Sequence, residues 1–211
     1  GKSSVVGAGL LPRLKKQGHC LVITMRPASD PWKGLSKLII DELDREEAPS
    51  ARIRSTNEFY QQLRESGPEA LREYAKALLA QERADRLVIY VDQFEELFTL
   101  AGHDRQASAE DKDAVNAPSP AAADFRDLMA QTATLEGAPK IQWIYSLRAD
   151  FSGRAFKHSA FRDAVGDGNL FLADMTQDEL RQAVAKPADD LGVAFEGPID
   201  DHPGLVTRIV E

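Results

Sequence analysis

The sequence is poor in several features that would assign it to particular classes of protein. Its 211 residues contain a single cysteine, Cys20, which excludes an internal disulfide framework and suits a reducing compartment. The residues after Cys20 are apolar, so it is expected to be a small core residue rather than a reactive thiol. The four histidines show no metal-ligand spacing, and surface or capping roles are favoured for them.

Long hydrophobic runs and an excess of positive charge are also missing. The longest apolar runs, such as residues 87–91, have the length of a strand and fall far short of the ~20 residues that span a bilayer. The formal net charge of -8 gives no overall electrostatic footprint for nucleic acid or an anionic membrane. Direct binding to either is therefore not expected, and a cytoplasmic protein is predicted.

The composition is that of an ordinary globular domain. Hydrophobic residues make up 43% and charged residues 28% of the chain, which is long enough for one sizeable α/β domain with a buried core. One domain is therefore predicted over residues 1–211. Residues 102–123 are rich in Ala, Asp, Ser and Pro and have no apolar period, which indicates a flexible surface insertion.

Apolar runs alternate with helical patterns along the chain. The runs predict buried strands at residues 20–25, 87–91 and 141–147, with a short one at 170–172. Such an alternation is typical of an α/β fold in which helices sandwich a parallel sheet. Helices are predicted over residues 4–16, kinked or shortened by Pro12, and then from Asp30-Pro31, from a capping box at 55–58, after Gly67-Pro68, and from a capping box at 176–179.

The chain opens with the last part of a phosphate-binding loop, G-x-x-x-x-G-K-[ST]. In that loop the backbone amides cradle the phosphates, the lysine reaches the β and γ phosphates, and the hydroxyl joins the Mg²⁺ shell. The first glycine and the preceding strand of the P-loop fold are not in the sequence, so we expect a longer protein, truncated here at both ends, and weak nucleotide binding by the segment alone. The candidate nucleotide-binding residues are Gly1, Lys2, Ser3 and Ser4, with Ser3 also a candidate Mg²⁺ ligand.

Acidic residues follow the strand predicted at residues 87–91. Asp92 at its end is a candidate Mg²⁺ ligand, acting through a water because Mg²⁺ dehydrates reluctantly. Glu95 and Glu96 come soon after it, and one of them is a candidate for orienting the attacking water, with Glu95 preferred. The alternative is that both merely open an exposed helix, where acids suit the positive end of the dipole.

Arginines end two of the predicted strands. Arg148 follows the strand at 141–147 and can face the same crevice as Asp92, because ligands of open α/β sheets bind at the carboxyl ends of strands. It is the candidate sensor of the γ-phosphate, and a structural ion pair with Asp150 or Asp92 is a compatible alternative. Arg26 is expected to lie further from the phosphates, with a structural or interdomain role favoured at least equally.

Several of these segments together resemble one family. The sequence is similar to the novel STAND NTPases, bacterial relatives of the NACHT and apoptotic ATPases, over nearly its whole length. The most specific segments are DQFEELFT at 92–99 and LRADF at 147–151. The others are Gly1 to Ser4 with Gly9 to Pro12, residues 26–31, Lys186-Pro187-Ala188 and Gly192.

The resemblance implies a function that the residues alone do not define. It implies an ATP-dependent molecular switch with ATP and Mg²⁺ as cofactors, placed between effector and sensor domains of one large chain. ATP binding would permit homo-oligomerisation and ADP would hold the resting state, in signal transduction, cell death or phage defence. The preference for ATP over GTP comes from the resemblance alone. Two other interpretations are a conventional AAA+ remodelling ATPase and a degenerate domain that serves only as an interaction scaffold.

Overall fold

The computed structural model describes residues 1–99, 120–137, 139–197 and 204–210. The chain divides into two compact units, residues 1–169 and 170–211. The composition predicts one domain over residues 1–211. Among the described helices, none is long and apolar enough to cross a membrane.

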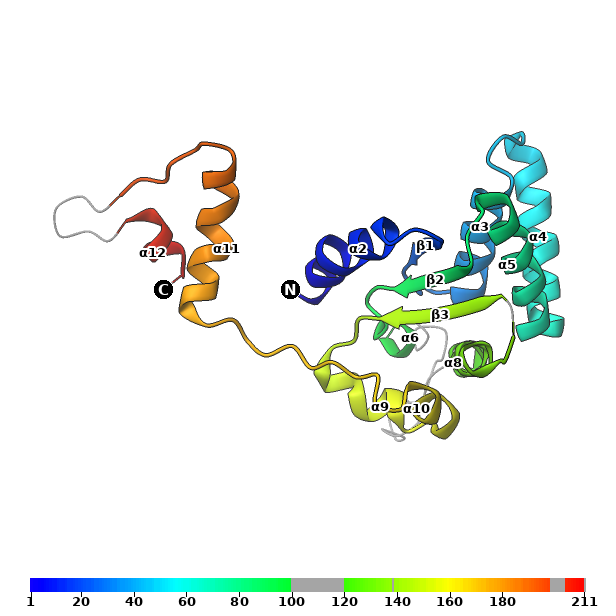
Figure 1. The fold of residues 1–211 in the computed structure, drawn as a ribbon. Coiled ribbons are helices and arrows are strands. Elements are labelled where there is room, and N and C mark those ends of the chain that lie inside the picture. The colour runs from blue at the N-terminus through cyan, green and yellow to red at the C-terminus, as the bar shows by residue number, and fades with distance from the viewer. Residues whose placement is uncertain (100–119, 138, 198–203, 211) are drawn as a thin grey trace. The chain divides into compact units, whose positions relative to one another are not determined.

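Three parallel strands form the sheet of the first unit: β1 Cys20–Met25, β2 Arg86–Val91 and β3 Lys140–Tyr145. Their order is β1-β2-β3, with β2 between the other two (Figure 1). Met25 lies opposite Val91, and Val91 lies opposite Tyr145, so all three strands end at the same level. The predicted α/β fold is confirmed, and the carboxyl edge of such a sheet is where its ligands bind.

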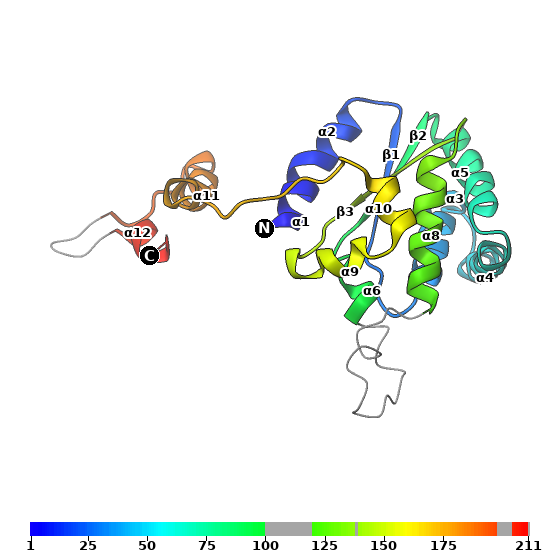
Figure 2. The same ribbon diagram turned by 90° about the horizontal axis from the view of Figure 1, so that it is seen from below.

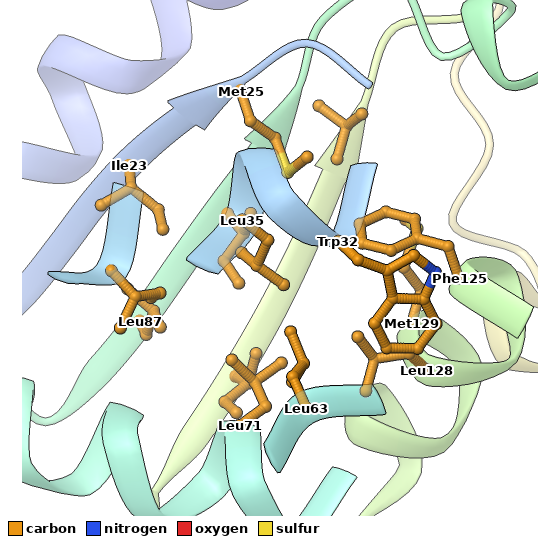
Figure 3. Packing of buried hydrophobic residues seen from close by; sticks show 14 of the residues in the cluster. Ile23, Met25, Trp32, Leu35, Leu63, Leu71, Leu87, Phe125, Leu128 and Met129 are labelled. Atoms are coloured by element: carbon orange, nitrogen blue, oxygen red, sulfur yellow. The ribbon is translucent and has the colours of Figure 1, made fainter. Parts of the chain in front are cut away.

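Long helices cover one face of the sheet and enclose the main hydrophobic core with it (Figures 2 and 3). Odd-numbered strand residues such as Ile23 and Leu87 point into this core, because successive side chains of a strand point to opposite faces. The Trp32 and Phe125 rings meet edge to face there, with centroids 5.6 Å apart. The helices are α3 Pro31–Leu43, α4 Pro49–Ser66, α5 Pro68–Glu82 and α8 Pro120–Thr134.

The N-terminal helical segment covers the opposite face of the sheet (Figure 2). Its buried Leu11 packs with Val22, Val88 and Tyr90, which are even-numbered and point away from the main core. This contact holds the first residues of the chain against the sheet. The segment consists of α1 Lys2–Ser4, the π-helix η1 Val5–Leu10 and α2 Leu11–Lys16.

This segment stays helical through Pro12, which the sequence predicts to kink or shorten it. Pro12 has no N–H and its ring clashes with the carbonyl four residues earlier in a regular α-helix. The turn before it is π-helical, and Leu11 donates its N–H to the carbonyl of Val6, five residues back. This wider turn shifts the hydrogen-bond pattern ahead of the proline, so the helix continues to Lys16.

The helix starts predicted at Asp30 and Pro68 are confirmed. The Asp30 carboxylate accepts a hydrogen bond from the Lys33 N–H at 3.0 Å, and Pro31 takes the first helical position of α3. Gly67 has a φ of 49° and turns the chain between α4 and α5, and Pro68 begins α5. Proline thus begins both helices, where its missing N–H leaves no helical hydrogen bond unmade.

The capping box predicted at residues 55–58 is wrong, because α4 begins at Pro49 and runs through them. Proline at the first helical position provides the start instead. The Thr56 hydroxyl donates to the carbonyl of Arg52, one turn earlier, at 2.8 Å. A hydroxyl satisfied in this way is compatible with a helix interior and does not mark a helix end.

The second unit contains the other predicted capping box. Thr176 and Glu179 form it completely, each side chain accepting the other residue's backbone N–H. The short strand predicted at residues 170–172 is wrong, since these residues have no regular structure and Leu170 is 82% exposed. A strand needs a neighbour for its backbone groups. The helices of this unit are α11 Gln177–Asp190 and α12 Leu205–Val210.

Most of the insertion predicted at residues 102–123 lies outside the described residues, namely residues 102–119. Residues 120–123 belong to the first turns of α8. Here the apolar period resumes within the Ala-rich stretch, because Ala122 and Phe125 are buried on the inner face of that helix.

Short helices and an aromatic cluster surround the turn that follows β2. The Phe94 ring is fully buried, stacks on Phe161 with centroids 5.3 Å apart, and lies 5.1 Å from the Tyr145 ring. Aromatic packing of this kind anchors the turn to the main core. The short helices are α6 Glu96–Thr99, the 3-10 helix η3 Ala149–Phe151, α9 Ser152–Phe156 and α10 Ser159–Val165.

The main core predicts that alanine substitutions of two isoleucines on neighbouring helices differ greatly in their effect on the free energy of unfolding. Ile39 on α3 is 0% exposed, whereas Ile53 on α4 is 64% exposed. We expect Ile39→Ala to lower the free energy of unfolding by about 2–5 kcal/mol, through lost burial and a cavity, and Ile53→Ala to change it by less than about 0.5 kcal/mol. Urea unfolding measures both. Similar losses of unfolding free energy in the two variants would contradict the burial of Ile39 and the exposure of Ile53.

Candidate functional site

One polar residue follows each strand at the carboxyl edge: Arg26 after β1, Asp92 after β2 and Ser146 after β3. The backbone ladder extends to this level, since Asp92 N–H donates to the Met25 carbonyl at 2.8 Å and Ser146 N–H to the Val91 carbonyl at 3.0 Å. All three residues have the even parity of the face that the N-terminal helix covers. Register and parity therefore bring their side chains together beside the start of that helix.

The Asp92 carboxylate is the centre of this arrangement. Its Oδ1 accepts hydrogen bonds from the hydroxyls of Ser3 at 2.7 Å, Ser146 at 2.7 Å and Tyr90 at 2.9 Å. Asp92 is only 6% exposed, and a carboxylate this buried requires such donors, because an unpaired buried charge is costly. The bonds also join the N-terminal helix to β2 and β3.

The other carboxylate oxygen, Asp92 Oδ2, faces an arginine. Arg26 Nη2 lies 3.4 Å from it, and the Arg26 side chain is 61% exposed whereas that of Asp92 is 9% exposed. The expectation that Arg26 lies further from the site does not hold, because β1 is the direct neighbour of β2. The acid is thus fixed and shielded, and its arginine reaches it from the solvent side.

Electrostatics keep the Asp92 carboxylate ionised. Burial by itself raises the pKa, but the hydrogen bonds from Ser3, Ser146 and Tyr90 and the charge of Arg26 favour the anion, and the pKa of Asp92 is lowered overall. The pKa of the Tyr90 hydroxyl is raised, first by burial and also by its bond to Asp92. At neutral pH the site therefore contains a carboxylate surrounded by neutral hydroxyl donors and one guanidinium.

Ser146 also fixes the turn after Asp92. Its hydroxyl accepts the N–H of Gln93 at 3.1 Å, and its carbonyl accepts the N–H of Phe94 at 2.9 Å. Gln93 has a φ of 55°, in the left-handed region that residues other than glycine rarely adopt. Strained residues of this kind cluster at functional sites, where the surroundings hold them in place.

The two glutamates after this turn contact different loops. Glu95 Oε2 accepts the Arg148 N–H at 3.4 Å, in the loop after β3, and Glu96 Oε2 accepts the Ala28 N–H at 3.1 Å, in the loop after β1. Both side chains are half-buried, and in the described residues neither is hydrogen-bonded to Asp92. They hold the loops on either side of Asp92, and a water-orienting role for either stays a prediction.

Arg148 forms the structural ion pair given above as one alternative. Its Nε and Nη2 donate to the two carboxylate oxygens of Asp150 at 3.2 and 2.9 Å. Its side chain is 59% exposed and its guanidinium lies 5.7 Å from the centre of the Phe151 ring. Among the described residues, the arginine paired with Asp92 is Arg26 and not Arg148.

The four residues of the phosphate-loop motif lie in the first turn of the N-terminal helix, where Ser4 N–H donates to the Gly1 carbonyl at 3.1 Å. Gly1, Lys2, Ser3 and Ser4 are all exposed. Free amides and the positive end of the dipole make a helix N-terminus favourable for anions. The Ser3 hydroxyl links this turn to Asp92.

The donor set fits Mg²⁺ accompanied by phosphates. Mg²⁺ prefers oxygen ligands, retains waters, and is usually held by one or two carboxylates together with substrate phosphates. The Ser3 hydroxyl and the Asp92 carboxylate are ligands of this kind. In the part of the chain that the structure describes, no group of three acidic, histidine or cysteine side chains could hold a metal alone. The oxygens of a nucleotide would have to complete the shell.

The class of protein follows from the fold: an α/β protein whose helix-flanked parallel sheet is that of a P-loop NTPase-like fold. Comparison with protein-family models matches residues 1–210 to the family described as Novel STAND NTPase 1. The chain belongs to this family, and the resemblance noted from its motifs is confirmed. Neither the curated proteins nor the solved structures gave a match. Membership of this family supports nucleotide binding.

Three partners of the Asp92 side chain are not among the residues that the motifs indicate. The sequence predicts that Arg26 lies further from the phosphates, and that Tyr90 and Ser146 belong to strands. The signal that could have found them is parity, because Tyr90 lies two residues before Asp92 on the same face of β2. Ser146 required the register of β3 against β2, which the sequence does not contain.

The lowered pKa of Asp92 predicts a pH-dependent contribution to stability. A lowered folded-state pKa stabilises the protein above the ordinary value of 3.8, and this contribution is lost as pH falls through the folded-state pKa. We expect Asp92→Asn to cost about 1–3 kcal/mol at pH 7, since three hydroxyls lose an ionic acceptor, and the difference from wild type to shrink below about pH 4.

Urea unfolding between pH 2.5 and 7 measures this effect. The control is Asp163→Asn, whose side chain is 71% exposed and which should change stability by less than about 0.5 kcal/mol. A loss for Asp92→Asn that stays constant across the whole pH range would contradict an ionised, hydrogen-bonded Asp92.

Proposed function

We propose that this domain binds ATP with Mg²⁺ and hydrolyses it slowly, as a regulatory switch. The observation that carries the proposal is the 2.7 Å hydrogen bond from the Ser3 hydroxyl to Asp92 Oδ1. It joins the end of a phosphate-binding loop motif to the acid at the end of a buried strand, which is the pairing that a nucleotide with its metal requires. Membership of an NTPase family supports the same function.

Each residue near this bond has a role in the proposal. Lys2 binds the β and γ phosphates, and the backbone amides of the first helical turn cradle them. Ser3 and Asp92 hold Mg²⁺, Asp92 through a water. When bound, Mg²⁺ supplies the positive charge that neutralises the phosphate oxygens during transfer. Tyr90 keeps the Asp92 carboxylate fixed and shielded in the bound state as well.

Glu95 and Arg148 have the proposed roles that depend on the γ-phosphate. The loops that Glu95 and Glu96 hold flank Asp92, so a small turn of the Glu95 side chain from Arg148 N–H would present its carboxylate to a water near the phosphate. Arg148 would exchange Asp150 for a γ-phosphate oxygen, which its planar fork suits equally well. In the absence of nucleotide, the Arg148–Asp150 pair keeps the arginine in place.

The proposed biological role extends beyond this domain. In it the domain belongs to a large multidomain protein with an effector domain before it and sensor domains after it. ATP binding permits homo-oligomerisation, and ADP holds the resting state, in a defence or cell-death pathway. The support for this part is the family assignment, which also favours a switch over a conventional AAA+ remodelling ATPase.

The binding role of Lys2 gives a direct test. We expect Lys2→Ala in the full-length protein to weaken ATP binding roughly 10- to 100-fold, because a charge-assisted contact to phosphate is lost. Lys16→Ala is the matched control, since Lys16 is exposed at the other end of the same helical segment and should bind ATP like the wild type. Calorimetry with ATP measures both. An unchanged ATP affinity in Lys2→Ala would show that the nucleotide does not bind at the first turn of the N-terminal helix.

The two glutamates are expected to separate binding from hydrolysis. Glu95→Gln keeps the size of the side chain but removes its charge, so ATP binding should stay within about twofold while hydrolysis falls roughly a hundredfold or more. Glu96→Gln should hydrolyse ATP at nearly the wild-type rate, since its carboxylate holds the loop of Ala28. Phosphate release assays measure turnover. Loss of hydrolysis in Glu96→Gln alone would exchange the two roles.

A further inference from the structure

Asp92 uses its two carboxylate oxygens differently. Oδ1 accepts hydrogen bonds from three hydroxyls at 2.7 to 2.9 Å, and this leaves little room for another partner. Oδ2 is the oxygen from which a metal-bound water could be held. The Arg26 guanidinium lies on that side, with Nη2 at 3.4 Å from Oδ2. A positive side chain therefore occupies the approach that a hydrated divalent cation needs.

Among the side-chain contacts of the Asp92 carboxylate, the contact with Arg26 is also the easiest to break. At 3.4 Å it is the longest of the four contacts to Asp92, near the upper limit for a hydrogen bond. The Arg26 side chain is 61% exposed, whereas Tyr90 is 2% exposed and Ser146 is 6% exposed. A long, exposed ion pair contributes little to stability, so its exchange for another anion costs little.

The backbone around Arg26 also connects it to the rest of the site. Arg26 lies between the end of β1 and the Asp30 cap of α3, and Ala28 in this loop has a φ of 49°. The Ala28 N–H is held by Glu96, at the start of α6 beyond the Asp92 turn. The loop backbone is thus fixed at the carboxyl edge while the Arg26 side chain extends from it into solvent, beside the residues proposed to bind phosphate.

We propose that Arg26 is an exchangeable counter-ion of the nucleotide site: it neutralises Asp92 in the empty site, competes with Mg²⁺ for Oδ2, and moves to a phosphate oxygen when Mg²⁺ enters with nucleotide. The inference rests on the proposed nucleotide site. A guanidinium suits both partners, since carboxylate and phosphate each accept its planar fork of donors. In the empty state Arg26 is the cation next to Asp92. In the bound state Mg²⁺ takes that place, and Arg26 adds its positive charge to the phosphates.

Competition with a cation predicts two effects of opposite sign in Arg26→Ala. Without Mg²⁺, the variant should bind ATP about tenfold more weakly than the wild type, because the Asp92 carboxylate then has no counter-ion and repels the phosphates. The free Mg²⁺ concentration that gives half of the full gain in ATP affinity should fall about two- to fivefold, because Asp92 no longer has a competing cation. A residue that only supports the fold would lower affinity by the same factor at every Mg²⁺ concentration.

Calorimetric titration of the full-length protein with ATP, in EDTA and at a series of free Mg²⁺ concentrations, tests the proposal. Arg26→Lys keeps the charge but loses the fork, so its Mg²⁺ dependence should resemble the wild type while its affinity in EDTA is intermediate. Arg181→Ala is the control, because Arg181 forms an exposed ion pair of similar length, 3.3 Å, with Asp178 on α11. It should match the wild type throughout.

The outcomes separate this inference from the function on which it rests. If the wild type binds ATP and Arg26→Ala either matches it or loses affinity uniformly across the Mg²⁺ series, the counter-ion role is wrong and the nucleotide site stands. If the wild type binds no ATP with or without Mg²⁺, the proposed function fails and the counter-ion role falls with it. Unfolding of each variant in urea, without nucleotide, identifies any loss that comes from stability alone.

Discussion

The buried carboxylate of Asp92 is the group on which the candidate site depends. It is the point where three separate elements meet: the first turn of the N-terminal helix through Ser3, β2 through Tyr90, and β3 through Ser146. An ionised group with this little exposure is stable only while its donors are in place, so the fold and the site reinforce each other. The same bonds that stabilise the anion also hold a hydroxyl of the phosphate-loop motif beside it.

Much of this arrangement could be predicted because it is local in sequence. The apolar run before Asp92 predicts a buried strand with an acid at its end, and the Asp30-Pro31 and Thr176–Glu179 signals mark helix starts that the structure contains. The motifs also identify the family. Local signals fail where a neighbour decides the outcome: the residues at 55–58 have the pattern of a cap but lie inside a helix that proline begins earlier.

The partners of Asp92 could not be predicted, because they depend on which strands are neighbours and in what register. The sequence predicts that Arg26 lies further from the phosphates, but β1 is directly beside β2 and brings Arg26 to the carboxylate. For Arg148 the sequence predicts a position facing the same crevice as Asp92, with an ion pair to Asp150 or Asp92 as a compatible alternative, and the structure contains the pair with Asp150. The two arginines are thus distinguished by their distance from the ends of their strands: one residue after β1 for Arg26, three after β3 for Arg148.

We propose that Ser3 and Asp92 together form a site for a nucleotide with its metal. Calorimetric titration of the full-length wild-type protein with ATP, in Mg²⁺ and in EDTA, tests it most directly. We expect saturable binding with one ATP per domain in Mg²⁺, and weaker binding in EDTA, because the oxygens of Ser3 and Asp92 require the cation to engage the phosphates. Absence of binding in Mg²⁺, or an affinity that is the same in EDTA, would contradict it.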